Sequence, residues 1–118
     1  MSTLNLGDSL ILDTDYSESE VKTGATWIDG KPIYMRTFTG TTAAINTWLD
    51  VPISSNIDKV WIAGSYIASS NGWVYTIGAS DTLVQIKPST SIFEVRVSQS
   101  YLASQPFAVT LCYTKTTD

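Results

Sequence analysis

A stretch of aromatic and small polar residues, SYIASSNGWVYTIGASD at 65–81, carries the side-chain types that bind sugars. Aromatic faces pack against sugar C–H groups, while amide, hydroxyl and carboxylate groups bind the sugar hydroxyls, in sites that are otherwise mostly apolar. A further aromatic residue lies in the polar stretch SQSYLASQP at 98–106, where we expect an exposed loop. The residues that we predict to bind a ligand are Tyr66, Asn71, Trp73, Tyr75, Asp81 and Tyr101.

Several of these side chains also fit a purely structural role. Trp73 and Tyr75 alternate along an apolar run, and this pattern is more typical of core positions than of an exposed site. Trp61 in KVWIAG is predicted to lie in the core, and the core is also favoured for Trp48 in NTWLDV. The dipeptide Asn71-Gly72 equally fits a turn that needs positive φ.

Catalytic chemistry finds little support in the residue types present. The chain has no histidine and no G-x-S-x-G motif, so a serine nucleophile would lack its usual base and turn. Glycan hydrolysis would need two carboxylates that flank the bond. A turn accounts for Asp29, while Asp58 precedes an expected strand and Glu94 lies on a polar strand face. We therefore expect no carboxylate pair among Asp29, Asp50, Asp58, Asp81 and Glu94, and we predict a non-enzymatic protein.

Composition limits the partners that the chain can have. Its 118 residues have the size of a single domain, with 43% hydrophobic and 15% charged residues. The net charge is −4 and the basic residues are scattered singly, whereas nucleic-acid binding needs a clustered basic face. No apolar run approaches the roughly 18 residues that span a bilayer, and the residues MSTLNLGDSL lead us to expect no secretion signal. We expect neither a nucleic-acid partner nor membrane insertion. The low use of charged residues is typical of assemblies and binding surfaces.

Metal and cofactor sites are not expected. No Cys/His cluster is present to hold zinc, and Cys112 in FAVTLCY fits a small buried hydrophobe better than a reactive thiol. In the acidic segment 13–23, Asp13, Asp15 and Ser17 imitate the first ligands of a calcium loop, but the turn glycine and the terminal glutamate are missing. We interpret residues 1–23 as an N-terminal strand and a solvated acidic connector, and 24–118 as the folded module.

Short runs rich in β-branched and aromatic residues recur along the chain, separated by turn residues. In IFEVRVS at 92–98, apolar residues alternate with Glu94 and Arg96, as in a half-buried antiparallel strand. This pattern predicts an all-β protein, an antiparallel β-sandwich or jelly roll of about eight strands with an N-terminal connector and hairpin. The expected strands are 9–13, 24–28, 33–38, 44–51, 58–67, 73–78, 82–87, 92–98 and 107–114.

The segment GATWIDGKPIYMRTF at 24–38 predicts a tight hairpin. Asp29-Gly30 fits a two-residue type I′ loop, in which both residues have positive φ and Ile28 pairs with Lys31. Trp27 then faces Pro32 in a non-hydrogen-bonded pair, where the missing amide of the proline has no cost inside the hairpin. The proline would still block a further strand on its outer side, as edge strands often do.

The same register predicts that both faces of this hairpin are apolar. Trp27, Pro32 and Tyr34 would lie on one face, with Ile28, Ile33 and Met35 on the other. A ribbon that is apolar on both faces must bury both, one on its own sandwich and one on a partner. We predict that Trp27, Pro32 and Tyr34 form an oligomer interface.

Three segments resemble one family of viral modules. YSESEVKTGATWIDGKPIYMRTF resembles the opening motif, NIDKVWIAGSYI the middle strand and VTLCYTKTTD the closing strand and tail. The family forms the C-terminal tips of tail-fibre and receptor-binding proteins in phages and prophages of Gram-positive and gut bacteria. The combination of WIDGKPIY and YTKTTD is its more specific part. This chain departs from the family in one respect, because Ala25 and Thr26 both separate Gly24 from Trp27.

The resemblance implies a β-sandwich tip, usually a homotrimer, that contacts a host cell-surface saccharide or protein. It also implies a place on the virion, at the tail-fibre tip, after synthesis in the bacterial cytoplasm. The alternative is a structural virion module without its own ligand, such as a head fibre, a baseplate component or a trimerisation cap. A polysaccharide depolymerase fragment is a third reading, which the missing histidine and the missing carboxylate pair disfavour.

Overall fold

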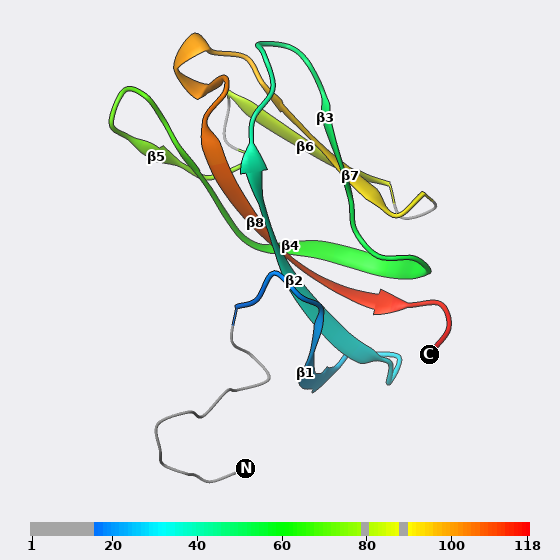
Figure 1. Cartoon of the computed structure of the whole chain (residues 1–118). Coiled ribbons are helices and arrows are strands. Elements are labelled where there is room, and N and C mark those ends of the chain that lie inside the picture. The colour runs from blue at the N-terminus through cyan, green and yellow to red at the C-terminus, as the bar shows by residue number, and fades with distance from the viewer. Residues whose placement is uncertain (1–15, 79–80, 88–89) are drawn as a thin grey trace, which may run out of the picture.

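Two antiparallel sheets build the part of the chain that the computed structural model describes, residues 16–78, 81–87 and 90–118. Figure 1 shows the smaller sheet beside one half of the larger sheet, with the hairpin of β1 (Val21–Thr26) and β2 (Pro32–Thr41) at the opposite end. The expected strand at 9–13, with Asp13 and Asp15, lies outside the described residues. The predicted all-β sandwich of about eight strands is confirmed.

The larger sheet has the order β1 (Val21–Thr26), β2 (Pro32–Thr41), β8 (Pro106–Lys115), β4 (Ile57–Ala68) and β5 (Val74–Tyr75). The smaller sheet has the order β3 (Leu49–Pro52), β7 (Ile92–Val97) and β6 (Thr82–Lys87).

The core lies between the inner faces of the two sheets. On β7, alternate side chains are buried, as the period-two pattern predicts. On β8, the central strand of the larger sheet, the apolar residues of the predicted inner face are buried together with Ala108 and Thr110 between them. Phe38 of β2 and Phe93 of β7 meet edge to face across the core, with ring centroids 5.3 Å apart. The fully enclosed apolar side chains are Ile67, Phe93, Val95, Val97, Leu102, Val109, Leu111 and Tyr113.

The first hairpin forms, but its loop has three residues and not two. The Trp27 amide donates to the Lys31 carbonyl at 2.9 Å, and the Gly30 amide donates to the Trp27 carbonyl at 2.9 Å. Gly30 has φ +87°, whereas Asp29 is not among the residues with positive φ. This bonding is typical of a type I turn followed by a left-handed glycine, so the predicted type I′ loop is wrong. The Asp29 carboxylate explains the outcome, since it accepts the Lys31 amide at 3.1 Å without leaving negative φ.

The longer loop changes which residues share a face, and the predicted face of Trp27, Pro32 and Tyr34 is wrong. Pro32 pairs with Thr26. Tyr34 is only 8% exposed, stacks on Tyr113 in the core with ring centroids 6.0 Å apart, and donates its hydroxyl to the chain's own C-terminal residue. A side chain buried in this way has little surface to offer a partner.

Trp27 instead stacks on Trp61, on the outer face of the five-stranded sheet. Their ring centroids are 4.8 Å apart, with the planes tilted by 36°. Val60 packs against the core and Trp61 follows it, so alternation turns the Trp61 ring outward. The expected core position of Trp61 is therefore wrong. The two indoles cover each other on the outer face of the larger sheet. That this face contacts another subunit remains a prediction.

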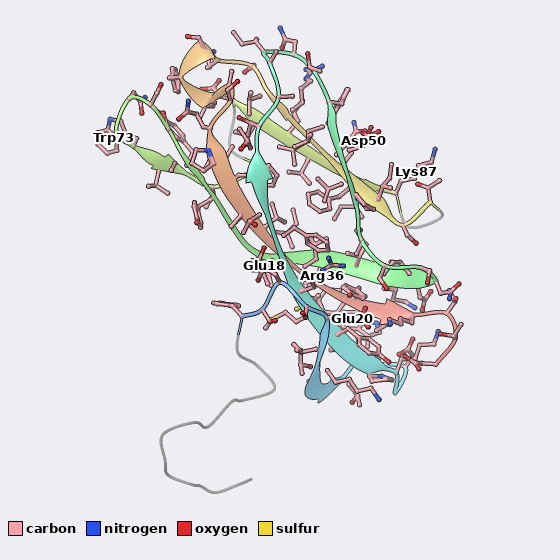
Figure 2. All side chains as sticks on the ribbon, in the orientation of Figure 1. Glu18, Glu20, Arg36, Asp50, Trp73 and Lys87 are labelled. Atoms are coloured by element: carbon pink, nitrogen blue, oxygen red, sulfur yellow. The ribbon has the colours of Figure 1, made fainter. Side chains whose placement is uncertain are left out.

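Residues 16–20, the described part of the predicted acidic connector, are bonded to the larger sheet, although Tyr16, Glu18 and Ser19 remain exposed. The Ser17 carbonyl accepts the Thr37 amide at 2.8 Å, and the Glu18 carbonyl accepts Arg36 Nε at 2.9 Å. Figure 2 shows Glu18, Glu20 and Arg36 gathered where this segment meets the larger sheet. β1 begins at Val21, and so the expected boundary at 23/24 falls inside a strand.

Two further strands are shorter than expected. β3 begins at Leu49 and not at 44, because the preceding residues turn sharply and Asn46 has φ 60°. β5 contains only Val74–Tyr75. A short 3-10 helix, η2 (Ser100–Leu102), takes the place of the loop expected around Tyr101. Within the described ranges, no helix is long and apolar enough to cross a membrane.

Candidate functional site

The β4–β5 hairpin repeats the loop of the first hairpin. The Ser69 amide donates to the Trp73 carbonyl at 3.0 Å, and the Gly72 amide donates to the Ser69 carbonyl at 3.1 Å. Gly72 has φ +91°. Asn71 occupies the position of Asp29, and its Oδ1 atom accepts the Trp73 amide at 3.0 Å and lies 2.6 Å from Ser69 Oγ. The loop is thus fixed by its own side chains before any ligand is present.

This fixed loop holds Trp73 in solvent. Trp73 is 71% exposed, and its neighbour Val74 is 68% exposed. Figure 2 shows Trp73 at the end of the hairpin, pointing away from both sheets. The core position that the alternation with Tyr75 favours is therefore wrong for Trp73. The side chain of Tyr75, in contrast, is partly buried and packs against the core.

Tyr75 and Tyr101 connect the hairpin to η2. Their ring centroids are 5.8 Å apart, with the planes tilted by 34°. Asn71 Nδ2 donates to the Tyr75 hydroxyl at 3.1 Å, and the Tyr101 hydroxyl donates to Asp81 Oδ2 at 3.1 Å. Burial and the hydrogen bond to Asp81 raise the pKa of Tyr101 to about 12. Tyr101 is half-buried and not the exposed loop residue that the sequence predicts.

The backbone ties the same elements together. The Tyr101 carbonyl accepts the Ser70 amide at 3.1 Å and Ser69 Oγ at 3.0 Å. The Ser98 amide donates to the Asp81 carbonyl at 3.1 Å. The structure therefore brings five of the six predicted binding residues to one end of the sandwich. We call these residues the apical cluster: Asn71, Trp73, Tyr75, Asp81 and Tyr101.

Tyr66, the sixth predicted residue, lies elsewhere. Strand alternation turns Ile67 into the core and Tyr66 to the outer face of the five-stranded sheet, where it is 48% exposed. It lines a mostly apolar hollow of about 220 Å³. The other lining residues are Tyr16, Thr37, Gly64, Ser65, Ala108 and Thr110. The prediction that Tyr66 shares a groove with the apical cluster is therefore wrong.

Sequence reasoning missed a carboxyl pair on the smaller sheet. Asp50 of β3 lies directly opposite Glu94 of β7 in the strand register. A hydrogen bond with Asp50 is the largest cause that raises the pKa of Glu94, and the charge of Lys87 opposes it. The expectation that no such pair forms is wrong, so the prediction of a non-enzymatic protein rests on the missing histidine and the missing G-x-S-x-G motif. The register between β3 and β7, which no local pattern encodes, is what creates the pair.

Trp48 and Cys112 have environments that differ from the expected core. Trp48, just before β3, is half-buried, and the Arg96 guanidinium lies 5.3 Å from its ring centroid. Cys112 is also half-buried, and burial raises the pKa of its thiol, which disfavours a reactive thiolate. Among the described residues, no group of three or more His, Cys, Asp or Glu is placed to hold a metal ion.

The apical cluster offers binding chemistry. Trp73 presents an aromatic surface, and Asn71 keeps one Nδ2 hydrogen beyond the one that it donates to Tyr75. Asp81 keeps acceptor capacity beyond its bond from Tyr101. No protein-family model matches this chain, and neither the curated proteins nor the solved structures give a match.

Proposed function

We propose that this chain is a non-enzymatic receptor-binding module, the tip of a phage tail fibre, that binds a host cell-surface saccharide or protein through the apical cluster. The observation that carries the proposal is the 71% exposure of Trp73 on a loop that its own hydrogen bonds fix. Trp73 and its neighbour Val74 together expose contiguous apolar surface at the loop tip, and contiguous exposed apolar surface supports a binding role.

Preorganisation supports a binding role. Binding is weakened by the cost of ordering side chains and loops, and a loop that is already ordered avoids much of that cost. Here Asn71 fixes the backbone on which Trp73 sits, and the Tyr101 carbonyl fixes the first half of the loop. The aromatic surface and the nearby amide are thus held in one arrangement, as sugar binding requires.

The place on a virion rests on the resemblance of the opening, middle and closing segments to tail-fibre tips. The β-sandwich is compatible with it, as is the low charge of the sequence. A homotrimer is part of the proposal. Of the three residues predicted to form its interface, Trp27 retains accessible surface beside Trp61, whereas Tyr34 does not.

One observation favours a structural virion module instead. The polar atoms of the apical cluster bond largely to one another, as Asn71 does to Tyr75 and Tyr101 does to Asp81. These bonds would be equally useful if they only attached the hairpin to η2. In that case the exposed Trp73 would contact another virion protein, and the chain would have no saccharide ligand.

A glycan array probed with the whole chain, together with light scattering, separates the two functions. The receptor-binding proposal predicts that saccharide spots bind the protein and that the protein is a trimer. A capping or structural module would still form the trimer but would leave every saccharide spot empty. A binding signal that survives removal of the Trp73 side chain would place the site outside the apical cluster.

A further inference from the structure

We infer that the apical cluster selects an uncharged saccharide and rejects anionic polymers that carry phosphate, sulfate or carboxylate groups. This inference rests on the proposed function and adds the chemical class of the ligand. Its basis is the distribution of charge around the site.

The segments that build the site contain no cationic side chain. Neither 69–75 nor 98–103 includes a lysine or arginine, and the same is true of the longer ranges 60–86 and 97–114. Proteins that bind phosphate or sulfate use arginine or lysine, because charge-assisted hydrogen bonds to the oxyanion provide most of the affinity. An anionic sugar would find no such partner on these segments.

Two of the lysines form ion pairs at the other end of the sandwich. Lys31 bonds to Asp58 at 3.1 Å and Lys115 to Glu20 at 2.6 Å, both beside the β1–β2 hairpin, at the far end of the sandwich from η2 in Figure 1. The nearest arginine in the sequence is Arg96, and its guanidinium lies over Trp48, on the β3 side of β7. Arg96 pairs with Leu83 of β6, two residues beyond Asp81, but its guanidinium lies over the Trp48 ring.

The one charged group in the cluster is a carboxylate. Asp81 is held at the site by the Tyr101 hydroxyl, and the chain as a whole has a net charge of −4. Charges closer than a Debye length, about 8 Å at physiological salt, are only partly screened. A phosphate or sulfate that approaches Asp81 within this distance would therefore meet repulsion, whereas the same carboxylate can accept hydrogen bonds from neutral sugar hydroxyls.

The remaining groups match a neutral sugar. The Trp73 ring offers a flat apolar surface for sugar C–H groups, and the free Nδ2 hydrogen of Asn71 can donate to a hydroxyl oxygen. Asp81 supplies the opposite polarity, an acceptor for hydroxyl hydrogens. Together they provide one apolar plane, one donor and one acceptor at one end of the molecule.

The test uses the whole chain against immobilised neutral oligosaccharides and their sulfated, phosphorylated and uronic-acid counterparts. We expect binding to neutral sugars, with an affinity that changes less than about twofold between roughly 0.05 and 0.5 M NaCl, because few ions are released. Binding confined to the anionic set, with a tenfold or greater loss over the same salt range, would overturn the inference. An array on which neither set binds would refute the proposed function itself, and the inference with it.

Two variants of opposite charge at one position sharpen the test. Gln99 is exposed, directly precedes η2 and makes no side-chain cap bond. Gln99→Lys should leave neutral-sugar binding within about twofold and should create measurable binding to the sulfated counterparts, while Gln99→Glu should create none. If wild type and Gln99→Glu bind the sulfated sugars as well as Gln99→Lys does, the site is not charge-selective and the inference is wrong.

Discussion

The rings of Tyr75 and Tyr101 lie 5.8 Å apart, and this contact joins the β4–β5 hairpin to η2 across a gap of 26 positions in the sequence. Each hydroxyl then holds a further polar group of the cluster: Tyr75 accepts from Asn71, and Tyr101 donates to Asp81. Tyr75 and Tyr101, which both pack partly against the core, therefore support the hairpin that carries the exposed Trp73.

The first prediction concerns that tryptophan. Trp73→Ala should abolish saccharide binding while changing the free energy of unfolding by less than about 0.5 kcal/mol, because the side chain is 71% exposed. Array binding and thermal unfolding of the same preparation measure both effects. Tyr66→Ala is the control, since Tyr66 lies on the outer face of the larger sheet and its removal should leave binding intact. A loss of about 3–5 kcal/mol in Trp73→Ala would instead indicate a core residue.

The second prediction concerns the first hairpin. Gly30→Val should destabilise the protein by roughly 1–3 kcal/mol, because a β-branched residue is forced to positive φ. Gly64→Ala is the matched control. A Cβ at either glycine would meet nothing within 4 Å, but only Gly30 has positive φ. Equal melting temperatures for wild type and Gly30→Val would show that the left-handed glycine is not needed.

The two hairpins show what local sequence does and does not determine. The Asx-Gly dipeptides located both turns correctly, because glycine is the residue that adopts left-handed φ. The type of loop depends on the Asp29 and Asn71 side chains, which accept amides two residues on and stabilise a three-residue loop. That difference of one residue decided which side of the hairpin Trp27 would occupy.

Alternation predicted the core well where both sheets cover a strand. The inward residues of β7 and β8 are buried as expected. Alternation failed for Trp61 and Trp73. The sequence pattern of a strand is the same whether a large aromatic side chain faces the other sheet, a neighbouring indole or solvent. Alternation also missed the pairing of Asp50 with Glu94, since register between distant strands is set by the tertiary fold.

A third prediction concerns Glu20. It accepts the buried Tyr113 hydroxyl at 2.5 Å and Lys115 Nζ at 2.6 Å. Burial alone would raise the pKa of Glu20, but the bonds from Lys115 and Tyr113 together outweigh it and lower the pKa below 4.5. The folded state then binds fewer protons than the unfolded state, so this stabilisation is full above pH 4.5 and is lost as the pH falls through the folded pKa.

Glu20→Ala should therefore cost about 1–3 kcal/mol near neutral pH, because the Tyr113 hydroxyl loses its partner in a buried position. Chemical denaturation at neutral and acidic pH measures the loss. The difference between Glu20→Ala and wild type should shrink on acidification. A difference that stays constant down to the acid limit would show that Glu20 is not ionised in its hydrogen bonds.

The Asp50–Glu94 pair leads to a fourth prediction, with the opposite sign. Because the hydrogen bond with Asp50 raises the pKa of Glu94 above 4.5, the folded state keeps a proton that the unfolded state releases. Stability should then fall as the pH rises through the folded pKa. Asp50→Asn should lower the pKa of Glu94 and remove this fall, as followed by carboxyl carbon NMR. A Glu94 titration that is the same in both proteins would exclude the coupling.

The fifth prediction is the assembly state. The stacked Trp27 and Trp61 and the low charge of the chain motivate a homotrimer, about three times 12.9 kDa by light scattering. Trp27→Glu should shift the mass toward the monomer, because a charge would be placed in the interface. Ile28→Glu, at a loop residue that is 90% exposed, is the control and should remain a trimer. A wild-type monomer at micromolar concentration would contradict this prediction.

The most direct measurement of the central claim is an amide NMR map of the saccharide contact. The labelled chain would be titrated with the neutral oligosaccharide that binds most strongly on the array. The account predicts that the amide shifts are concentrated in 69–75 and 98–103, the segments that carry Trp73, Asn71 and Tyr101. Shifts confined to the hollow beside Tyr66, or to the face that carries Asp50 and Glu94, would contradict it.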